Sequence, residues 1–203
     1  MKAWIVSIVA MFFLAQPLSA NSAKDVKATV TKRIGQVITL LRDTKIKRAT
    51  RDQKILDIVN PIFDFKKMAK LSLGKTHWKS FSKAQRKEFS DLFVKRLQES
   101  YLEKLSLYTD EDVVVDDATQ VKKNRIVVLT HLVSKDDKKE MIYKFYKSKK
   151  KGWMVYDVDV LGVSIVQTYR SQFTGVLKNE SIEGLLAQLR KQGTMKAVDL
   201  SKK

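Results

Sequence analysis

Apolar residues recur at every third or fourth position through the first part of the chain. Between residues 23 and 43 this spacing places one apolar stripe along an amphipathic helix. The stripe consists of Val26, Val30, Ile34, Val37 and Leu41. Thr50 and Gln53 have the spacing of a capping box, which predicts a second helix that Pro61 bends or ends. We therefore expect two helices before the chain reaches this proline.

Two further helices follow, and capping residues mark their ends. Asp64 is placed to open a short helix and Gly74 to end it, because aspartate accepts free backbone N–H groups and glycine tolerates the turn after a helix. Ser82 and Gln85 form a second capping-box pattern, which opens a long helix reaching to about Tyr108. Its apolar stripe consists of Phe89, Phe93, Leu97, Tyr101 and Leu105. Such a stripe packs either into an ordinary core or along a ligand, and its spacing leaves both open.

From about residue 112 the apolar period falls to two, which indicates strands. The pattern predicts four strands, at 113–115, 125–133, 139–147 and from 152 to the glycine at 162. Three short connections join them, so we expect an antiparallel meander. Because helices cluster before and after the strands, the expected class is α+β, with a four-stranded curved antiparallel sheet wrapped by about six to seven helices around an apolar cavity.

The second and third predicted strands carry apolar residues on both faces. Residues 126–133 are apolar except for Thr130 and His131, whereas a half-exposed strand would alternate with charges. The third strand places three large side chains on one face: Met141, Tyr143 and Phe145. One face of the sheet therefore suits the core and the other suits a cavity, and the sequence leaves open which face does which.

The fourth predicted strand runs through one glycine into a helix. Alternation places four apolar residues on one face of the strand: Met154, Tyr156, Val158 and Val160. After Gly162 the period becomes that of a helix, whose stripe consists of Val163, Val166, Arg170, Phe173 and Leu177. A strand and a helix that meet at such a corner leave room for an apolar cavity between them.

Several of these segments together carry a resemblance to a known family. They are Pro61-Ile62-Phe63-Asp64-Phe65, Leu73-Gly74 before Trp78, the helix with Gln85 and Phe89, Trp153-x-x-Tyr156-Asp157, Gly162-Val163-Ser164, and Tyr169-Arg170-Ser171-Gln172-Phe173. In this order, over residues 24–192, the chain resembles the MlaC family of periplasmic phospholipid carriers, the auxiliary components of Mla ABC lipid-transport systems. The resemblance implies a fold related to the NTF2-like proteins.

The same resemblance implies the function and the partners. The expected protein is a monomeric carrier without enzymatic activity, cofactor or metal, which shuttles phospholipid between an outer-membrane lipoprotein complex and an inner-membrane ABC transporter with an MCE-domain protein. Both acyl tails would lie in an apolar pocket, and contact with membrane surfaces would be transient. The candidate pocket residues are Phe89, Phe93, Leu97, Tyr101, Val128, Met141, Tyr143, Phe145, Tyr156, Val163, Val166 and Phe173. The candidates for contact with a head group or a partner are Arg170, Lys144 and Lys147.

The beginning of the chain has the pattern of a secretory signal peptide. Lys2 forms a short basic region, residues 4–14 are apolar, and Ser19-Ala20 supplies small residues, so we expect cleavage between residues 20 and 23. One carrier domain at 21–193 and a basic tail at 194–203 would follow. The chain contains no cysteine, which excludes disulfides and a lipidated cysteine.

Charge and motif patterns keep other functions under consideration. The formal net charge is +18, which favours anionic partners such as nucleic acid or an anionic lipid surface. Export argues against nucleic acid, and a basic exported module for another apolar or anionic ligand remains an alternative. Ser164, His131 and Asp157 are the ingredients of a hydrolytic triad, but the second glycine of the nucleophile elbow is missing. Ser164 alternatively caps a helix, and Arg170 alternatively pairs with Asp157.

Overall fold

The computed structural model describes residues 18–106, 111–135 and 137–191. Most of the predicted signal peptide and the predicted basic tail lie outside these residues. The helices are α1 (Leu18–Arg42), α2 (Arg48–Val59), α3 (Phe65–Leu73), α4 (Lys75–Ser80), α5 (Lys83–Leu105), α6 (Ile165–Asn179) and α7 (Ile182–Arg190). The strands are β1 (Asp112–Lys122), β2 (Arg125–Val133), β3 (Lys138–Ser148), β4 (Gly152–Val160) and β5 (Val163–Ser164). The α+β class is confirmed.

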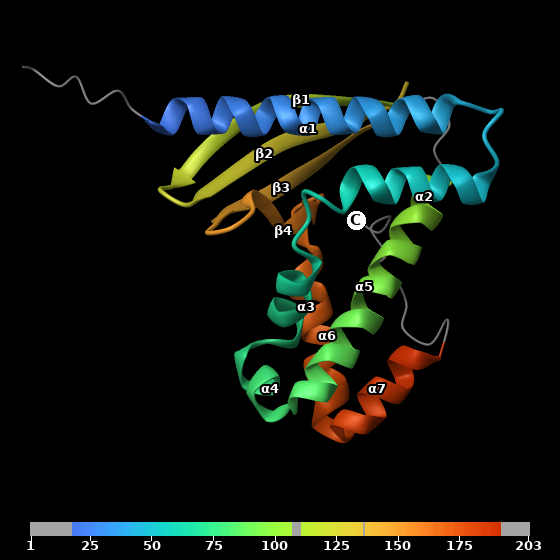
Figure 1. The fold of residues 1–203 in the computed structure, drawn as a ribbon, viewed down its shortest axis with the longest axis vertical. Helices are drawn as coiled ribbons and strands as arrows, with labels where there is room; N and C mark the ends of the chain where they lie inside the picture. Colours follow the sequence, from blue (N-terminus) through green and yellow to red (C-terminus); the bar gives the residue numbers. More distant parts are fainter. Residues whose placement is uncertain (1–17, 107–110, 136, 192–203) are drawn as a thin grey trace, which may run out of the picture.

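The elements form an upper layer and a lower lobe (Figure 1). In the upper layer, α1 lies along one face of an antiparallel sheet with the strand order β1-β2-β3-β4-β5, and α2 runs beside the second half of α1. Helices α3, α4, α6 and α7 form the lobe below, and α5 rises from the lobe towards α2. The side chains near the end of α5 pack with those of α1 and α2, so α5 connects the two parts.

The sheet has five strands, and the expected four were too few. Leu161 and Gly162 both have positive φ values, 51° and 77°. Two such residues make the two-residue turn that matches the twist of an antiparallel hairpin. The chain therefore folds back before α6 begins, and Val163 pairs with Val160. The first strand is also longer than predicted: it reaches Lys122, with irregular register after Val115.

Three of the four capping signals predicted between residues 50 and 85 are confirmed. Ser82 accepts a hydrogen bond from the Gln85 backbone while Gln85 bonds back, and Asp64 caps α3. Gly74 ends α3 with a φ of 78°. The Thr50 capping box was wrong, because α2 already begins at Arg48 and has no side-chain cap.

Candidate functional site

One face of the sheet is covered by α1, and the two faces of β2 differ in burial. Ile126, Val128 and Thr130 are buried, and the alternate residues on the other face are only half-buried. Val26 and Val30 of α1 pack against this buried face. The part of this sheet face that lies beneath α1 is therefore packed core.

The strand register arranges the covered face in rows of side chains. Val128 is paired with Tyr143, which is paired with Val158. A second row joins Thr130, Met141, Val160 and Val163. Residues paired across antiparallel strands share a face. The second row passes from a buried threonine to Val163, whose exposed fraction is 44%, so this row leads from the interior to an open edge.

The apolar stripe of α5 shows the same gradient along the helix. Phe89 and Phe93 are 0% and 1% exposed, Leu97 is half-buried, and Tyr101 is 37% exposed. The first two rings pack within the helical lobe, with Phe173 of α6 at 5.2 Å from Phe89. The stripe therefore begins in a closed core, and its later residues, which lie towards the sheet and α2, are only partly buried.

Phe63 and Phe65 are not among the predicted pocket residues, but they lie where the packed regions meet. Phe63 is half-buried and packs against all three core clusters: the helical lobe, the sheet with α1, and the α1–α2 contact. Its ring stacks on Phe65 at 5.3 Å and meets Tyr143 edge-on at 6.4 Å. The segment is fixed because the backbone of residues 62 and 64 bonds to Val155 of β4. Its motif supported the resemblance, but nothing in the local pattern placed it against β3.

We call this group of incompletely buried side chains the junction set. Seven of its members are incompletely buried side chains that pack against these clusters: Phe63, Phe65, Leu97, Leu102, Tyr143, Val160 and Ile165. The other three are Met141 and Val163, which pair with Val160 in the sheet, and Tyr101, which lies near Tyr143. They come from the α2–α3 connection, the start of α3, α5, β3, β4, β5 and the start of α6. A surface of this composition suits an alkyl chain, because apolar burial is non-directional and the set offers almost no charge.

Other predicted pocket residues belong to closed packing in this structure. Phe89, Phe93, Val166 and Phe173 lie in the helical core, where none is more than 3% exposed. Val128 and Phe145 are buried beneath α1. Of the predicted pocket residues, Leu97, Tyr101, Met141, Tyr143 and Val163 therefore belong to the junction set, and the six residues just named lie in closed packing.

Tyr156 lies on the opposite face, and the alternation predicted for its strand was wrong at this point. Lys144 pairs with Asp157 while the next residue of β3 pairs with Val155, so Tyr156 is the extra residue of a β-bulge. Its ring meets Tyr146 at 6.0 Å, and the Arg125 guanidinium lies 5.2 Å from its centre. The bulge turns the aromatic ring away from the covered face.

Lys144 also lies on the opposite face, between two carboxylates. Its ammonium is 3.1 Å from Asp157 and 2.6 Å from Asp159. Burial lowers the pKa of Lys144, but the hydrogen bonds and charges of Asp159 and Asp157 outweigh it and raise the pKa above its usual value. This ammonium is therefore held as a cation within an ion-pair cluster.

Asp157 and Ser164 together cap the start of α6, so the cap predicted for Ser164 is confirmed. The Ser164 hydroxyl accepts the Gln167 N–H at 3.0 Å and donates to Asp157 at 2.8 Å, while Asp157 accepts the Val166 N–H. His131 instead lies 2.5 Å from Asp116. Among the described residues the three triad candidates thus do not form a Ser–His hydrogen bond, and each polar group has another partner.

Arg170 binds a backbone carbonyl, and the predicted pairing with Asp157 was wrong. Its Nε and Nη2 both donate to the Leu71 oxygen in α3, at 2.9 and 2.6 Å. Carbonyl groups near a helix C-terminus carry partial negative charge, which a guanidinium satisfies. Gly74 lies beside this contact, and a Cβ there would make only ordinary contact with the Arg170 Nε, at 3.7 Å; the glycine is favoured by its positive φ of 78°. Arg170 therefore ties α6 to α3.

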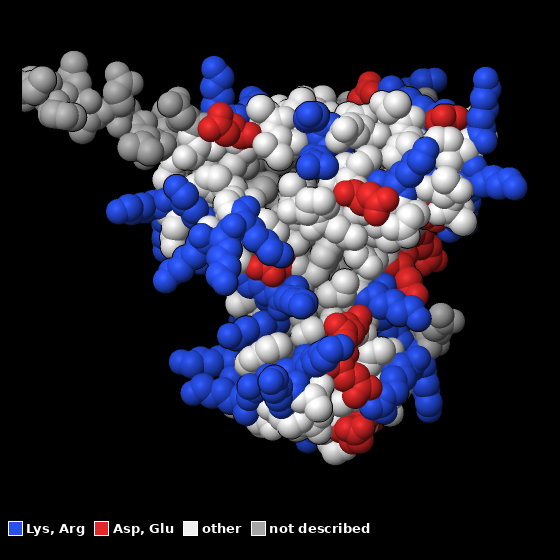
Figure 2. Space-filling view, in the orientation of Figure 1, with Lys and Arg blue, Asp and Glu red and all other residues white. Residues whose placement is uncertain are grey.

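Basic and aromatic side chains form a strip along the ends of the strands and over α3 and α4. Its cations lie over rings: Lys67 and Arg125 over Tyr146, Lys147 over Trp153, and Lys70 and Arg86 over Trp78. Figure 2 shows lysine and arginine gathered over the left of the lobe and beneath the strand ends. Burial and the neighbouring Arg125 lower the pKa of Lys67, as expected where cations crowd. We call these five cations the basic strip.

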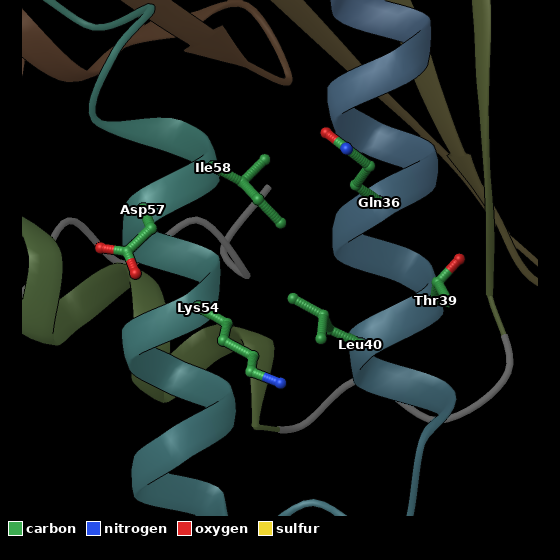
Figure 3. Close-up of a pocket in the computed structure, with 6 residues that line it drawn as sticks. All are labelled: Gln36, Thr39, Leu40, Lys54, Asp57 and Ile58. Carbon is green, nitrogen blue, oxygen red and sulfur yellow. The ribbon is translucent and has the colours of Figure 1, made fainter.

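A separate groove of about 410 Å³ runs between α1 and α2 (Figure 3). Leu40 and Ile58 face each other across it, and Gln36, Thr39, Lys54 and Asp57 form its polar rim. Both apolar residues also pack into the cluster that includes Phe63 and Leu102. The groove therefore lies on the outer side of the apolar cluster against which Phe63, Phe65 and Leu102 of the junction set pack.

Within the described ranges, no helix combines the length and apolarity needed to cross a membrane. Nor do three or more histidine, aspartate or glutamate side chains come together there in a way that suits a metal ion.

Comparison with known proteins assigns the family. The family model described as MlaC protein matches residues 31–191, and the chain therefore belongs to the MlaC family. It is similar to the intermembrane phospholipid transport system binding protein MlaC of Haemophilus influenzae, at 21% identity over 123 residues. That alignment covers 59% of this chain and 58% of the relative, so the chain spans less than two thirds of the curated relative that it matches.

A solved structure supports the same fold. The phospholipid-binding protein from Ralstonia solanacearum, solved in complex with a phospholipid, matches with a TM-score of 0.68. The match covers 81% of this chain and 98% of the other at 24% sequence identity. At this identity the likeness concerns the arrangement of helices and strands.

Proposed function

We propose that the protein is a periplasmic phospholipid carrier that holds both acyl tails against the junction set. The observation that carries the proposal is that apolar side chains from seven different segments come together while each stays only partly buried. Family membership and the phospholipid-bound relative of the same fold support it. The carrier needs no covalent chemistry, so the proposal includes no enzymatic step.

The energetics of the cargo define what the site must do. Moving two tails of about sixteen carbons from a bilayer into water would cost on the order of 25 kcal/mol, at about 0.8 kcal/mol per methylene. This exceeds the roughly 18–21 kcal/mol at which noncovalent affinities saturate. A carrier therefore has to keep nearly all of both tails out of water, and the head group can stay at the opening. The row that ends at Val163 provides apolar surface from the interior to such an edge.

The partners follow from the family and from the surface charge. We propose exchange with an outer-membrane lipoprotein complex on one side and with an inner-membrane ABC transporter bearing an MCE-domain protein on the other. The basic strip, which includes Lys147, supports transient contact with anionic membrane surfaces, because each basic residue near such a surface contributes about 1 kcal/mol. The predicted signal peptide supports export to the periplasm, and a monomer suits a shuttle.

The proposal is tested by native mass spectrometry of the protein purified from the periplasm without detergent. We expect bound phospholipid in simple stoichiometry, released by organic extraction. Repeated preparations that fold correctly but contain no phospholipid would reject the carrier function. Another bound apolar molecule would favour the alternative of a basic exported module with a different ligand. Sequence-selective DNA binding at physiological salt would contradict the exclusion of nucleic acid, since charge alone gives weak and salt-sensitive binding.

A further inference from the structure

Two tyrosines are the polar exceptions within the junction set. Tyr101 belongs to α5. Tyr143 belongs to β3, and its pairing with Val128 places it on the covered face of the sheet. Neither hydroxyl has a hydrogen-bond partner among the described residues, whereas the Tyr146 hydroxyl on the opposite face donates to Asp64. A phenol hydroxyl in an apolar setting is usually bonded, because leaving such a donor without a partner is unfavourable.

The surroundings of the two phenols show which kind of space they face. Tyr101 is 37% exposed, which by itself would suggest an outer surface. Burial nevertheless raises the pKa of Tyr143 to about 12, and burial together with the nearby Tyr143 raises the pKa of Tyr101 above its usual range. Accessible surface together with dense surrounding protein fits a side chain that lines a concave apolar surface. At neutral pH both phenols remain neutral hydrogen-bond donors.

The chemistry of a phospholipid offers one matching group for these donors. The hydrocarbon tails contain no acceptor. A phosphate in an enclosed apolar space would require a cation, but Lys144 is paired on the other face and Arg170 binds the Leu71 carbonyl. The two ester carbonyls that join the tails to glycerol are neutral acceptors, they come as a pair, and they sit between the tails and the head group.

We propose that Tyr101 and Tyr143 donate hydrogen bonds to the ester carbonyls of a bound diacyl phospholipid. The inference rests on the proposed carrier function and adds a selectivity to it. The hydroxyls would fix how deeply the tails enter, and they would favour ester-linked over ether-linked lipids. An ether oxygen is a poorer acceptor at the same position, while the tails and the head group are unchanged.

The test is a competition between two lipids. The purified protein is incubated with vesicles that hold equal amounts of dipalmitoyl and dihexadecyl phosphatidylglycerol, and native mass spectrometry measures the bound ratio. One hydrogen bond of ordinary strength corresponds to a preference of roughly three- to tenfold, so we expect wild type to favour the diacyl lipid by about tenfold or more. Tyr101→Phe and Tyr143→Phe should each reduce this ratio, and the double variant should bring it close to one.

The control is Tyr146→Phe, which removes a hydroxyl bonded to Asp64 on the opposite face and should leave the ratio unchanged. Thermal unfolding is recorded for each variant, and the single variants carry the test if the double variant does not fold. Equal binding of the two lipids by wild type would overturn the inference while the carrier function stands. An undiminished preference in both single variants would equally overturn it. Wild type that takes up neither lipid would instead reject the proposed function.

Discussion

The helical lobe and the junction set contain similar residues, but only the lobe is fully packed. Phe89, Phe93, Tyr169 and Phe173 contact one another at ring distances of 5.2–6.2 Å, and none is more than 5% exposed. Around Phe63, by contrast, aromatic side chains from distant segments meet while retaining accessible surface. The same helix, α5, contributes to both regions.

This difference shows how a core can be distinguished from a ligand wall. Residue type and helical spacing are the same along the α5 stripe, so neither separates the two roles. What changes is whether the neighbours complete the burial of each side chain. A packed interior leaves few voids larger than a water molecule, whereas a carrier has to preserve apolar surface for its cargo.

The strongest test of this comparison truncates one residue in each region. Phe93→Ala should lower the free energy of unfolding by about 3–5 kcal/mol, because it leaves a cavity in a closed core. Met141→Ala in the junction set should cost clearly less, because its side chain is only half-buried, and it should reduce phospholipid content. Urea unfolding followed by circular dichroism measures both. Equal losses would show that the junction set is ordinary core.

A charged residue at the open edge of the sheet tests whether the junction set, and not the helical lobe, binds the phospholipid. Val163→Glu should leave the protein folded, because the side chain is 44% exposed and its carboxylate can reach water, but the protein should lose its phospholipid. Val114→Glu is the matched control: this valine is 47% exposed and pairs with His131, on the sheet face away from α1. Thermal unfolding and extracted phospholipid are measured together. A folded Val163→Glu protein with full lipid content would remove this edge from the site.

The sequence predicted those features whose causes are local. Ser82 with Gln85, Asp64 and Gly74 marked helix ends because capping acts within a few residues. The strands after residue 112 were placed because alternation and turns are also local signals. Thr50 shows the limit, since its spacing fitted a cap although the helix began earlier.

Features that depend on pairing between distant segments could not be predicted. The bulge at Tyr156 is a property of the β3–β4 register, and it reversed the face of that residue. The fifth strand depends on Leu161 at a φ of 51°, a conformation that leucine rarely adopts and therefore does not signal. Phe63 entered the site through backbone bonds to Val155, 92 positions further along the chain. Partial burial itself is invisible to a binary apolar pattern.

Arg170 tests whether a charged residue near the lobe serves packing or cargo. Arg170→Ala removes two donors from the Leu71 carbonyl and should lower the free energy of unfolding by about 1–3 kcal/mol, with phospholipid content unchanged. Arg170→Lys should recover only part of this, because an ammonium cannot reproduce the planar pair of donors. Chemical denaturation and lipid extraction provide the two readings. Loss of phospholipid at normal stability would instead support contact with the head group.

The smallest expected effect concerns Ser164, at the point where the two regions join. Ile165, the first residue of α6, packs against both the helical lobe and the sheet cluster, so the cap beside it fixes how the regions meet. Ser164→Ala should cost only about 1 kcal/mol, because Asp157 still accepts the Val166 N–H and remains paired with Lys144.

Ser181→Ala provides the matched control, since Ser181 caps α7 in the same way by accepting the Gly184 N–H. Both variants should show similar small shifts in thermal unfolding and full phospholipid content. If Ser164→Ala alone emptied the protein, the hydroxyl would contribute to the lipid site. If it abolished a measurable ester hydrolysis, the hydrolase alternative would return. If both variants keep a normal phospholipid content, the contact between β4 and the start of α6 depends mainly on the Asp157 carboxylate. This carboxylate would then support the fold without contacting the lipid.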